Sequence, residues 1–369
     1  MHKCLVCGNE SCQIIFERKN ESLARYGFLK SEISPPLAKG LDQKIAYCDK
    51  CSYAWNTVFE YEKIKYDSDQ IIEAGHFSKR YLDYQKASAI YLRRLMGFKP
   101  ETIVEIGAGA GIFINEFDAK RKVAIEPSDE AKGIDKSVEV YNEYYKEEKF
   151  NFAADIVVMR QVLEHIKDPV QFLKKIQKSF DKTKNFYLYI EVPNSTFTFR
   201  FGRFYDYYYE HCNYFSTKTI IKIAEKLNMN IVDLSTAMDG ELISVLLTSE
   251  QLSYSNLKSN LEKNRWLILN ELKQKISAGK KILAWGASGN GVQILNNLDI
   301  NKNLIECVID SDVNKQGLFI PGTKQQIISP EAAVEYGPDV VLVLTQFHKT
   351  EIGVACSKLF GDAEVWFID

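Results

Sequence analysis

Two pairs of cysteines stand near the amino terminus of the 369-residue chain, and two residues separate the members of each pair. Cys4 and Cys7 form the first pair, and Cys48 and Cys51 form the second. Two thiolates at this spacing can face one ion, and four complete the tetrahedral sulfur set that zinc prefers. The spacing predicts a structural zinc site, for which Cys12 is close enough to compete as a ligand. Four unconnected thiols are the alternative.

A glycine-rich turn is the second chemical signature, in the sequence TIVEIGAGAGIFINEF. A buried strand at 102–106 should lead through Gly107 and Gly109 into a helix, because glycine lets the backbone come close to a nucleotide. The next strand, 122–126, ends at Glu126, where an acid can bind a ribose diol. A solvated acid at a strand end is the alternative. Dehydrogenases and methyltransferases share such turns, so this turn alone predicts only a nucleotide crevice.

The third chemical signature is a histidine that could transfer a proton. It lies in the segment YYEHCNYFS, after a predicted strand at 186–192. Histidine suits proton transfer near neutral pH, and an adjacent glutamate can raise its basicity or hold a substrate hydroxyl. His211 and Glu210 therefore suggest a general base. The alternative is a histidine that caps the helix beginning near residue 216. The stretch 195–220 is so rich in Phe and Tyr that it is typical of a packed lid.

Alternating strands and helices must position these residues. Residues 80–97 have helical spacing and end before Lys99-Pro100, and Asp168-Pro169 should cap another helix. Further strands are expected at 138–142, 154–160 and 243–247. The alternation predicts an α/β, doubly wound, Rossmann-like domain.

The strand at 154–160 runs into QVLEHIKDP, and this run together with VEIGAGAG and the following acid resembles class I S-adenosylmethionine-dependent methyltransferases. The resemblance covers about residues 76–250. It assigns six residues to the cofactor site: Glu105, Gly107, Gly109, Glu126, Asn142 and Gln161. It implies that the glycines pass close to the methionine part and that Glu126 accepts from both ribose hydroxyls. Asn142 would neighbour the adenine and Gln161 the sulfonium.

The last third of the chain repeats the pattern of strand, glycine turn and helix. A long amphipathic helix at 256–280 precedes KILAWGASGNGVQ, and a strand at 305–309 ends at Asp310. These features predict a second Rossmann-like domain. Its glycines, Gly286, Gly289 and Gly291, follow the spacing GxxGxG, which does not favour NAD. The turn could receive a diphosphate through backbone amides, and a purely structural domain is the alternative.

The order of these modules resembles the sugar C-methyltransferases, which methylate carbon 3 of nucleotide-linked 4-keto-deoxysugars. The resemblance implies that His211 is the base that forms an enolate and that Tyr208 and Glu210 position the sugar or stabilise the enolate. His165 of the LEH motif would contact the substrate or support strand 154–160. Carbon methylation requires such a base and an acidifying carbonyl. The chain is a divergent member, with Asn290 where the family pattern has lysine and GAGAG where the family has a Ser-Asn-Asp-Gly type of turn.

Charge and composition narrow the partners. The chain has 47 Lys and Arg against 49 Asp and Glu, a net charge of −2, which disfavours nucleic acid as a substrate. No apolar run reaches the roughly 20 residues that span a membrane, and the amino terminus lacks a signal-peptide pattern. We therefore expect a cytoplasmic protein. The resemblance implies a nucleotide-linked sugar as its substrate, and the protein would act as a monomer or a homo-oligomer.

Three domains are predicted: a zinc-binding module at 1–75, a methyltransferase domain at 76–250 and a Rossmann-like domain at 251–369. A sugar O-methyltransferase, a zinc-containing RNA methyltransferase and a non-catalytic binding protein are the alternative functions.

Overall fold

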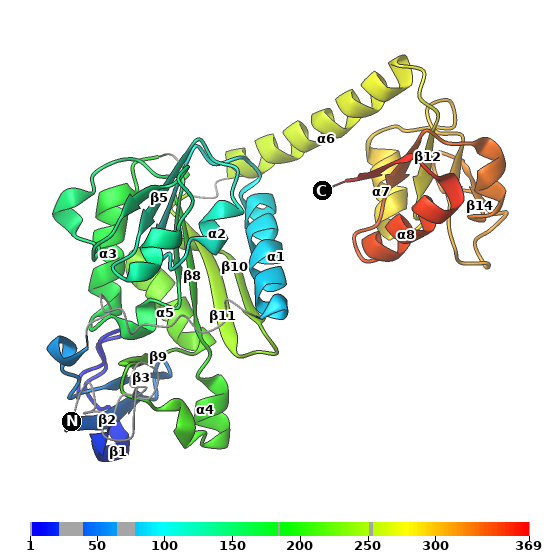
Figure 1. Ribbon diagram of the computed structural model, residues 1–369. Coiled ribbons are helices and arrows are strands. Elements are labelled where there is room, and N and C mark those ends of the chain that lie inside the picture. The colour runs from blue at the N-terminus through cyan, green and yellow to red at the C-terminus, as the bar shows by residue number, and fades with distance from the viewer. Residues whose placement is uncertain (1, 22–39, 65–77, 184, 251–253, 369) are drawn as a thin grey trace. The chain divides into compact units, whose positions relative to one another are not determined.

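The computed structural model describes residues 2–21, 40–64, 78–183, 185–250 and 254–368. The chain divides into two compact units, Met1–Gln251 and Leu252–Asp369 (Figure 1). The predicted division into three domains stays a prediction, because its boundaries fall within or beside residues outside the described ranges.

A seven-stranded sheet, in the order β10-β11-β8-β7-β4-β5-β6, forms the centre of the first unit. Neighbouring strands pair in parallel from β8 to β6, whereas β11 runs antiparallel to both β8 and β10. The strands are β4 (Thr102–Ile106), β5 (Arg121–Ile125), β6 (Glu139–Tyr141), β7 (Ile156–Arg160), β8 (Tyr187–Pro193), β10 (Asn230–Ala237) and β11 (Leu242–Thr248). The doubly wound α/β fold is confirmed, and the edge strand β10 is an addition to the predicted strands.

Helices cover both faces of this sheet, which explains why its central strands are continuous apolar runs (Figure 1). Ile103 belongs to a buried cluster that includes residues of α1 (Lys79–Met96) and α2 (Ile112–Asn115). Val104, which points to the opposite face, belongs to a cluster that includes residues of α3 (Pro169–Phe180) and α5 (Thr217–Leu227). Both strand residues are fully buried.

Local signals set the helix ends. Helix α1 begins after Ser78, whose hydroxyl accepts from the Tyr81 amide, and it ends at Gly97, which has a φ of 70°. Gly97 therefore ends this helix before Lys99-Pro100 is reached. Asp168 caps α3 by accepting from the Gln171 amide at 3.0 Å, as predicted. The helix that follows the first glycine turn, α2, has only four residues.

A four-stranded sheet in the order β1-β2-β3-β9 joins the amino-terminal segment to the rest of the first unit. Its first three strands are β1 (Gln13–Glu21), β2 (Leu41–Cys48) and β3 (Tyr53–Asn56). The fourth strand, β9 (Asn213–Tyr214), comes from the aromatic segment after β8 and pairs with Ala54 and Trp55 of β3. The two residues that follow His211 and Cys212 are thus part of the amino-terminal sheet.

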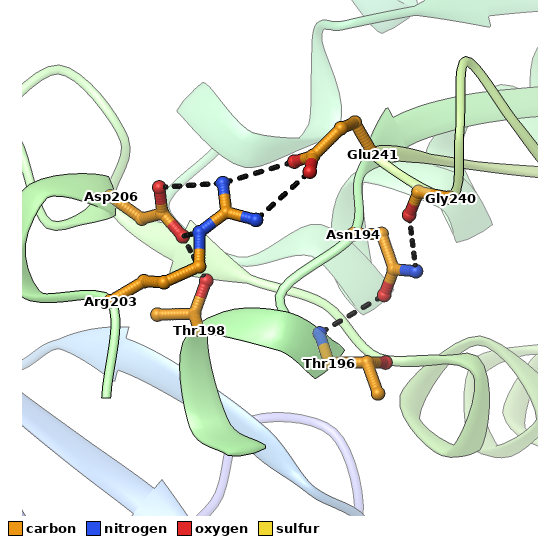
Figure 2. Close-up of polar contacts among 7 residues, drawn as sticks. All are labelled: Asn194, Thr196, Thr198, Arg203, Asp206, Gly240 and Glu241. Carbon is orange, nitrogen blue, oxygen red and sulfur yellow. Dashed lines mark hydrogen bonds and ion pairs between the residues drawn. The ribbon is translucent and has the colours of Figure 1, made fainter. Parts of the chain in front are cut away.

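The aromatic segment also contains α4 (Thr196–Phe201) and the short 3₁₀ helix η5 (Phe204–Asp206). Figure 2 shows how Arg203 holds it: the guanidinium makes two bonds to Glu241, at 2.9 and 3.0 Å, and two to Asp206. Thr198 donates to the same Asp206 carboxylate. At the start of α4, Asn194 donates to the Gly240 carbonyl at 2.7 Å. The segment is therefore tied to the turn between β10 and β11.

The second unit contains a five-stranded parallel sheet in the order β14-β13-β12-β15-β16. Its elements are α6 (Tyr254–Ser277), β12 (Ile282–Trp285), α7 (Gly289–Asn297), β13 (Cys307–Ile309), β14 (Gln326–Ile328), β15 (Val340–Val343), α8 (Lys349–Phe360) and β16 (Glu364–Phe367). This is the second Rossmann-like fold that the sequence predicts. Among the helices within the described ranges, including the 24-residue α6, none is long and apolar enough to cross a membrane.

Candidate active site

A cavity of about 680 Å³ opens at the carboxyl ends of β4, β5 and β7, the usual ligand position in an open α/β sheet. The final residues of these strands, Ile106, Ile125 and Arg160, line it. Six of the residues predicted to form the site also line it: Glu105, Gly107, Gly109, Glu126, Gln161 and His165. Four others, Asn142, Tyr208, Glu210 and His211, are not among its lining residues.

The first glycine turn is shaped by close packing as well as by backbone conformation. Gly107 has a φ of 73°, and a Cβ there would lie 2.3 Å from a methyl carbon of Val162. Its amide donates to the Ile125 carbonyl at 2.8 Å, which holds the turn against the end of β5. Gly109, at a φ of 52°, presents its amide to the carboxylate of Glu126. The turn and the acid of the next strand are thus a single hydrogen-bonded unit.

Glu126 is 7% exposed and is fixed by two backbone donors, the amides of Gly109 at 2.9 Å and Ser128 at 2.8 Å. It is therefore not a solvated acid at a strand end. A carboxylate has room for about four hydrogen bonds, so two acceptor positions remain after these contacts. Asn142 supports the same loop, because its amide group donates to the carbonyls of Glu126 and Ser128. Its contact with the adenine stays a prediction.

Gln161 lines the cavity in a left-handed conformation, with a φ of 53°. Its side-chain amide donates to the Tyr81 hydroxyl at 2.7 Å, and its backbone amide donates to the Glu191 carbonyl at 2.8 Å. These two bonds fix the chain at the point where it leaves β7. The sulfonium contact predicted for Gln161 is not tested by these bonds.

A buried ion pair between Arg160 and Glu191 lies at this end of the cavity. Neither residue was predicted from the sequence to belong to the site. Arg160 donates to Glu191 at 3.0 Å and to the Tyr81 hydroxyl at 3.0 Å, and its guanidinium lies 4.5 Å from the centre of the Phe113 ring. Glu191 is fully buried and also accepts from Tyr84. Burial, and then the Glu191 charge, raises the pKa of Tyr84 above its ordinary value. The sequence did contain a signal for this pair: a charged residue at or near the end of each of two apolar strands, β7 and β8.

Two histidines meet beside the cavity. His165 closes the 3₁₀ helix η4 (Leu163–His165), and its ring centre lies 4.9 Å from that of His211. The Nδ1 atom of His165 lies 2.8 Å from the Glu210 carbonyl oxygen. Because a carbonyl only accepts, Nδ1 carries the hydrogen, and Nε2 is the basic nitrogen of neutral His165. The structure thus brings together a cavity-lining imidazole and the predicted base.

The predicted catalytic residues of the aromatic segment lie close to one another. The Tyr208 hydroxyl is 3.1 Å from Nε2 of His211, and the two rings are 4.3 Å apart. His211 is 4% exposed, and Glu210 is fully buried. One donor atom from each of Glu164, His165 and His211 lies within 4.8 Å of the others, a set of types that could also hold a metal ion. Glu164 is in the LEH motif but was not among the predicted site residues.

The amino-terminal sheet fixes this segment from the other side. The Asn56 amide donates to the Cys212 carbonyl at 2.9 Å, and the Tyr53 hydroxyl donates to the side chain of Asn213. The side chain of Asn213 in turn donates to the Leu163 carbonyl in η4 at 3.1 Å. Ser216, not His211, caps α5, so the alternative of a helix-capping histidine is wrong.

The four paired cysteines form one cluster. The Sγ atoms of Cys4 and Cys51 are 3.6 Å apart, those of Cys7 and Cys48 are 3.5 Å apart, and all four lie within 4.8 Å of one another. Contact with the Cys51 thiol lowers the pKa of Cys4 to about 5. Cys12 is outside this set and contacts the Asn9 carbonyl.

The second glycine turn repeats one feature of the first. Asp310, after β13, accepts from the amides of Ala287 at 2.8 Å and Asp312 at 2.9 Å, and it pairs with Lys315. A Cβ at Gly291 would lie 1.9 Å from the Gly286 carbonyl oxygen, so packing alone requires that glycine. Diphosphate binding at this turn stays a prediction.

The matching family models and a similar protein are all described as methyltransferases. A model described as a methyltransferase domain matches residues 78–234, and one described as a C-methyltransferase C-terminal domain matches residues 238–368. C-methyltransferase NovU of Streptomyces niveus is 24% identical over 322 residues, which cover 75% of this chain and 76% of NovU.

Solved structures also match part of the chain. The plantazolicin methyltransferase BpumL, in complex with a monoazolic desmethylPZN analogue and SAH, is 13% identical over 47% of this chain and 84% of its own, with a TM-score of 0.37. A SAM-dependent methyltransferase from Aquifex aeolicus is 16% identical over 47% of this chain and 98% of its own, with a TM-score of 0.35.

Proposed function

We propose that this chain, which matches two methyltransferase family models and is similar to a C-methyltransferase, is a divergent member of the S-adenosylmethionine-dependent sugar C-methyltransferase family and methylates carbon 3 of a nucleotide-linked 4-keto-deoxysugar. The observation that carries the proposal is the pair of buried imidazoles of His165 and His211 beside the cavity. Methylation of carbon needs a base, whereas methylation of oxygen needs little more than an aligned lone pair.

The residues of the cavity suit S-adenosylmethionine. The glycine turn exposes backbone at Gly107 and Gly109, and the fixed carboxylate of Glu126 has acceptor positions for a ribose diol. Glu105, 1% exposed, lines the cavity and supplies negative charge near the ammonium end. When bound, the cofactor supplies an electrophilic methyl group that carries its own leaving group. The protein must therefore place a nucleophilic carbon in line with it.

In the proposed reaction, His211 removes the proton from carbon 3, and the electron pair of that C–H bond becomes the enolate of the 4-keto sugar. Tyr208 contacts Nε2 of His211 and orients the imidazole. Glu210 accepts from His165 through its backbone carbonyl and so positions an imidazole that lines the cavity. His165 lines the cavity and contacts the substrate from the η4 side. The carbanion equivalent then receives the methyl group, and the ketone re-forms.

We assign zinc to the Cys4, Cys7, Cys48 and Cys51 cluster on the chemistry of its donors. Four sulfur ligands leave no open position for a substrate, so the role of the ion is structural. The cluster supports β2 and β3, the strands that lead to β9 and the base.

The test is the variant His211→Asn with a panel of nucleotide-linked 4-keto-6-deoxysugars. Two readouts are exchange of the carbon 3 proton in deuterated water and methyl transfer located by NMR. We expect both to fall by at least about 100-fold, the usual scale of a general base, while S-adenosylhomocysteine binding is unchanged.

Retained methyl transfer in this variant would remove His211 from the base role. Transfer to a sugar oxygen, found in the wild-type enzyme by NMR, would replace the proposal with O-methylation. A matched variant, His348→Asn, changes an exposed histidine of the second unit and should leave both rates at the wild-type level.

A further inference from the structure

Glu164 is a buried acid between the two histidines of the site. It is 1% exposed, and one of its carboxylate oxygens lies within 4.8 Å of an imidazole nitrogen of both His165 and His211. Burial of a carboxylate is costly unless a positive or hydrogen-bonding group compensates it. Both imidazoles lie at this distance and can carry the opposite charge.

The backbone around Glu164 fixes it to the segment that carries the base. Its carbonyl accepts from the Cys212 amide at 2.9 Å and contacts the Cys212 thiol at 3.4 Å. On the other side, the Glu210 carbonyl receives Nδ1 of His165. These reciprocal contacts hold η4 and residues 210–212 in one arrangement. The distance between the carboxylate and the imidazoles is therefore set by the fold.

We infer that Glu164 is the positioning residue that holds the His165–His211 pair and stabilises the imidazolium formed when His211 takes the substrate proton. This inference rests on the proposed function for its place in the reaction. The carbon–hydrogen bond breaks, its electrons remain on the sugar as the enolate, and the proton forms a new N–H bond on His211. The carboxylate of Glu164 then lies beside the positive charge that forms on His211. A negative charge within this range makes an imidazole a stronger base.

Other titratable groups also surround the two imidazoles. They are Glu210, Tyr208 and Cys212 before β9, Tyr53 on β3, Tyr214 on β9, Tyr61 from the short helix at 61–63, and Lys167 and Asp168 after η4. Burial raises the pKa of Cys212, Tyr53 and Tyr214, so these three are neutral near pH 7. Glu210, Lys167 and Asp168 are the other acidic and basic side chains around the pair, and all three stay unchanged in a comparison of the wild type with Glu164→Gln.

The test is histidine titration by NMR in the whole protein without substrate. The protein is labelled at histidine, and signals are assigned with His165→Asn and His211→Asn. We expect Glu164→Gln to lower the apparent pKa of the imidazole pair by about one unit or more, a tenfold loss of proton affinity. Glu62→Gln, which changes an exposed acid at the cavity, should leave the titration as in the wild type.

An unchanged titration in a folded Glu164→Gln protein would overturn the inference. If that variant does not fold, Glu164→Asp, which keeps the charge at shorter reach, should lower the pKa by a smaller amount, and no shift would again refute it. The readout needs no substrate, so it is separate from the proposed function. Full turnover in His211→Asn together with a shifted titration in Glu164→Gln would refute the base and leave the coupling of Glu164 to the imidazoles established.

Discussion

Glu126 joins the glycine turn to the end of β5 through its two amide donors, and its remaining acceptor positions face the cavity. We predict that Glu126→Gln weakens binding of S-adenosylhomocysteine by about 10- to 100-fold, because hydrogen bonds to a charged acceptor contribute roughly 1.5–3 kcal/mol. Isothermal titration calorimetry measures this directly. Asp129→Asn, which changes an exposed acid three residues later, is the matched control. Equal affinities of the two variants would exclude a ribose contact by Glu126.

Some of the site residues could be predicted from the sequence, and others could not. Glu126 was predictable because its position depends on one strand, one turn and the spacing between them. The Arg160–Glu191 pair was not, because it forms only when β7 and β8 lie side by side and α1 brings Tyr81 and Tyr84 across their ends. The place of Glu164 in the site could not be predicted either, because it depends on proximity to His211. That residue is 47 residues away in sequence and comes close to Glu164 only in the folded chain.

At the level of elements, the amino-terminal sheet contacts the segment that carries the proposed base, His211. The Cys48–Cys51 turn reaches α5 directly, because Thr219 donates to the Cys51 carbonyl at 3.0 Å and Ser216 donates to the Ser52 carbonyl at 3.1 Å. Strand β9, which pairs with β3, lies between these contacts and His211 in the sequence. We therefore expect the position of the proposed base to depend in part on the geometry of the cysteine cluster.

We predict that Cys48→Ser loses the proposed zinc ion and lowers turnover by at least about tenfold, because a displacement of about 1 Å at a reacting group can cost roughly 100-fold. Binding of S-adenosylhomocysteine should change little, since the glycine turn and Glu126 have no contact with the cluster in the described residues. Metal analysis, calorimetry and turnover provide the three readouts. Cys12→Ser is the control and should retain the metal. Loss of cofactor binding together with turnover would indicate general unfolding.

The strands that the sequence predicted are those whose apolar side chains are buried. Residues 102–106 match β4 fully, and the strand expected at 154–160 begins two residues later as β7. Among the strands that the prediction omitted, β10 is an edge strand with exposed or half-buried residues and β9 has two residues, whereas β2 and β3 are largely buried in the amino-terminal sheet. β9 is a strand because it pairs with β3, which is far away in the sequence, whereas β10 pairs with its sequence neighbour β11.

At the scale of the whole molecule, all the described residues that line the cavity belong to the first unit. We predict two calorimetric transitions, of which S-adenosylhomocysteine raises only the one that belongs to residues 1–251. At a ligand concentration of 100 times Kd, the stabilisation should be about 2.7 kcal/mol. Equal shifts of both transitions, or a single transition, would show that the two units unfold together. The control is the same scan with adenosine at equal concentration.

The pairing of β9 with β3 has a consequence for building chimaeras of this enzyme. Exchanging the amino-terminal module for that of a relative would replace β3, the strand with which Asn213 and Tyr214 pair. The exchange must therefore carry residues 208–219 with it, although they are more than 130 residues away in sequence. The residues that must be transferred together are therefore discontinuous in the sequence, and a chimaera with a single crossover point cannot keep them together.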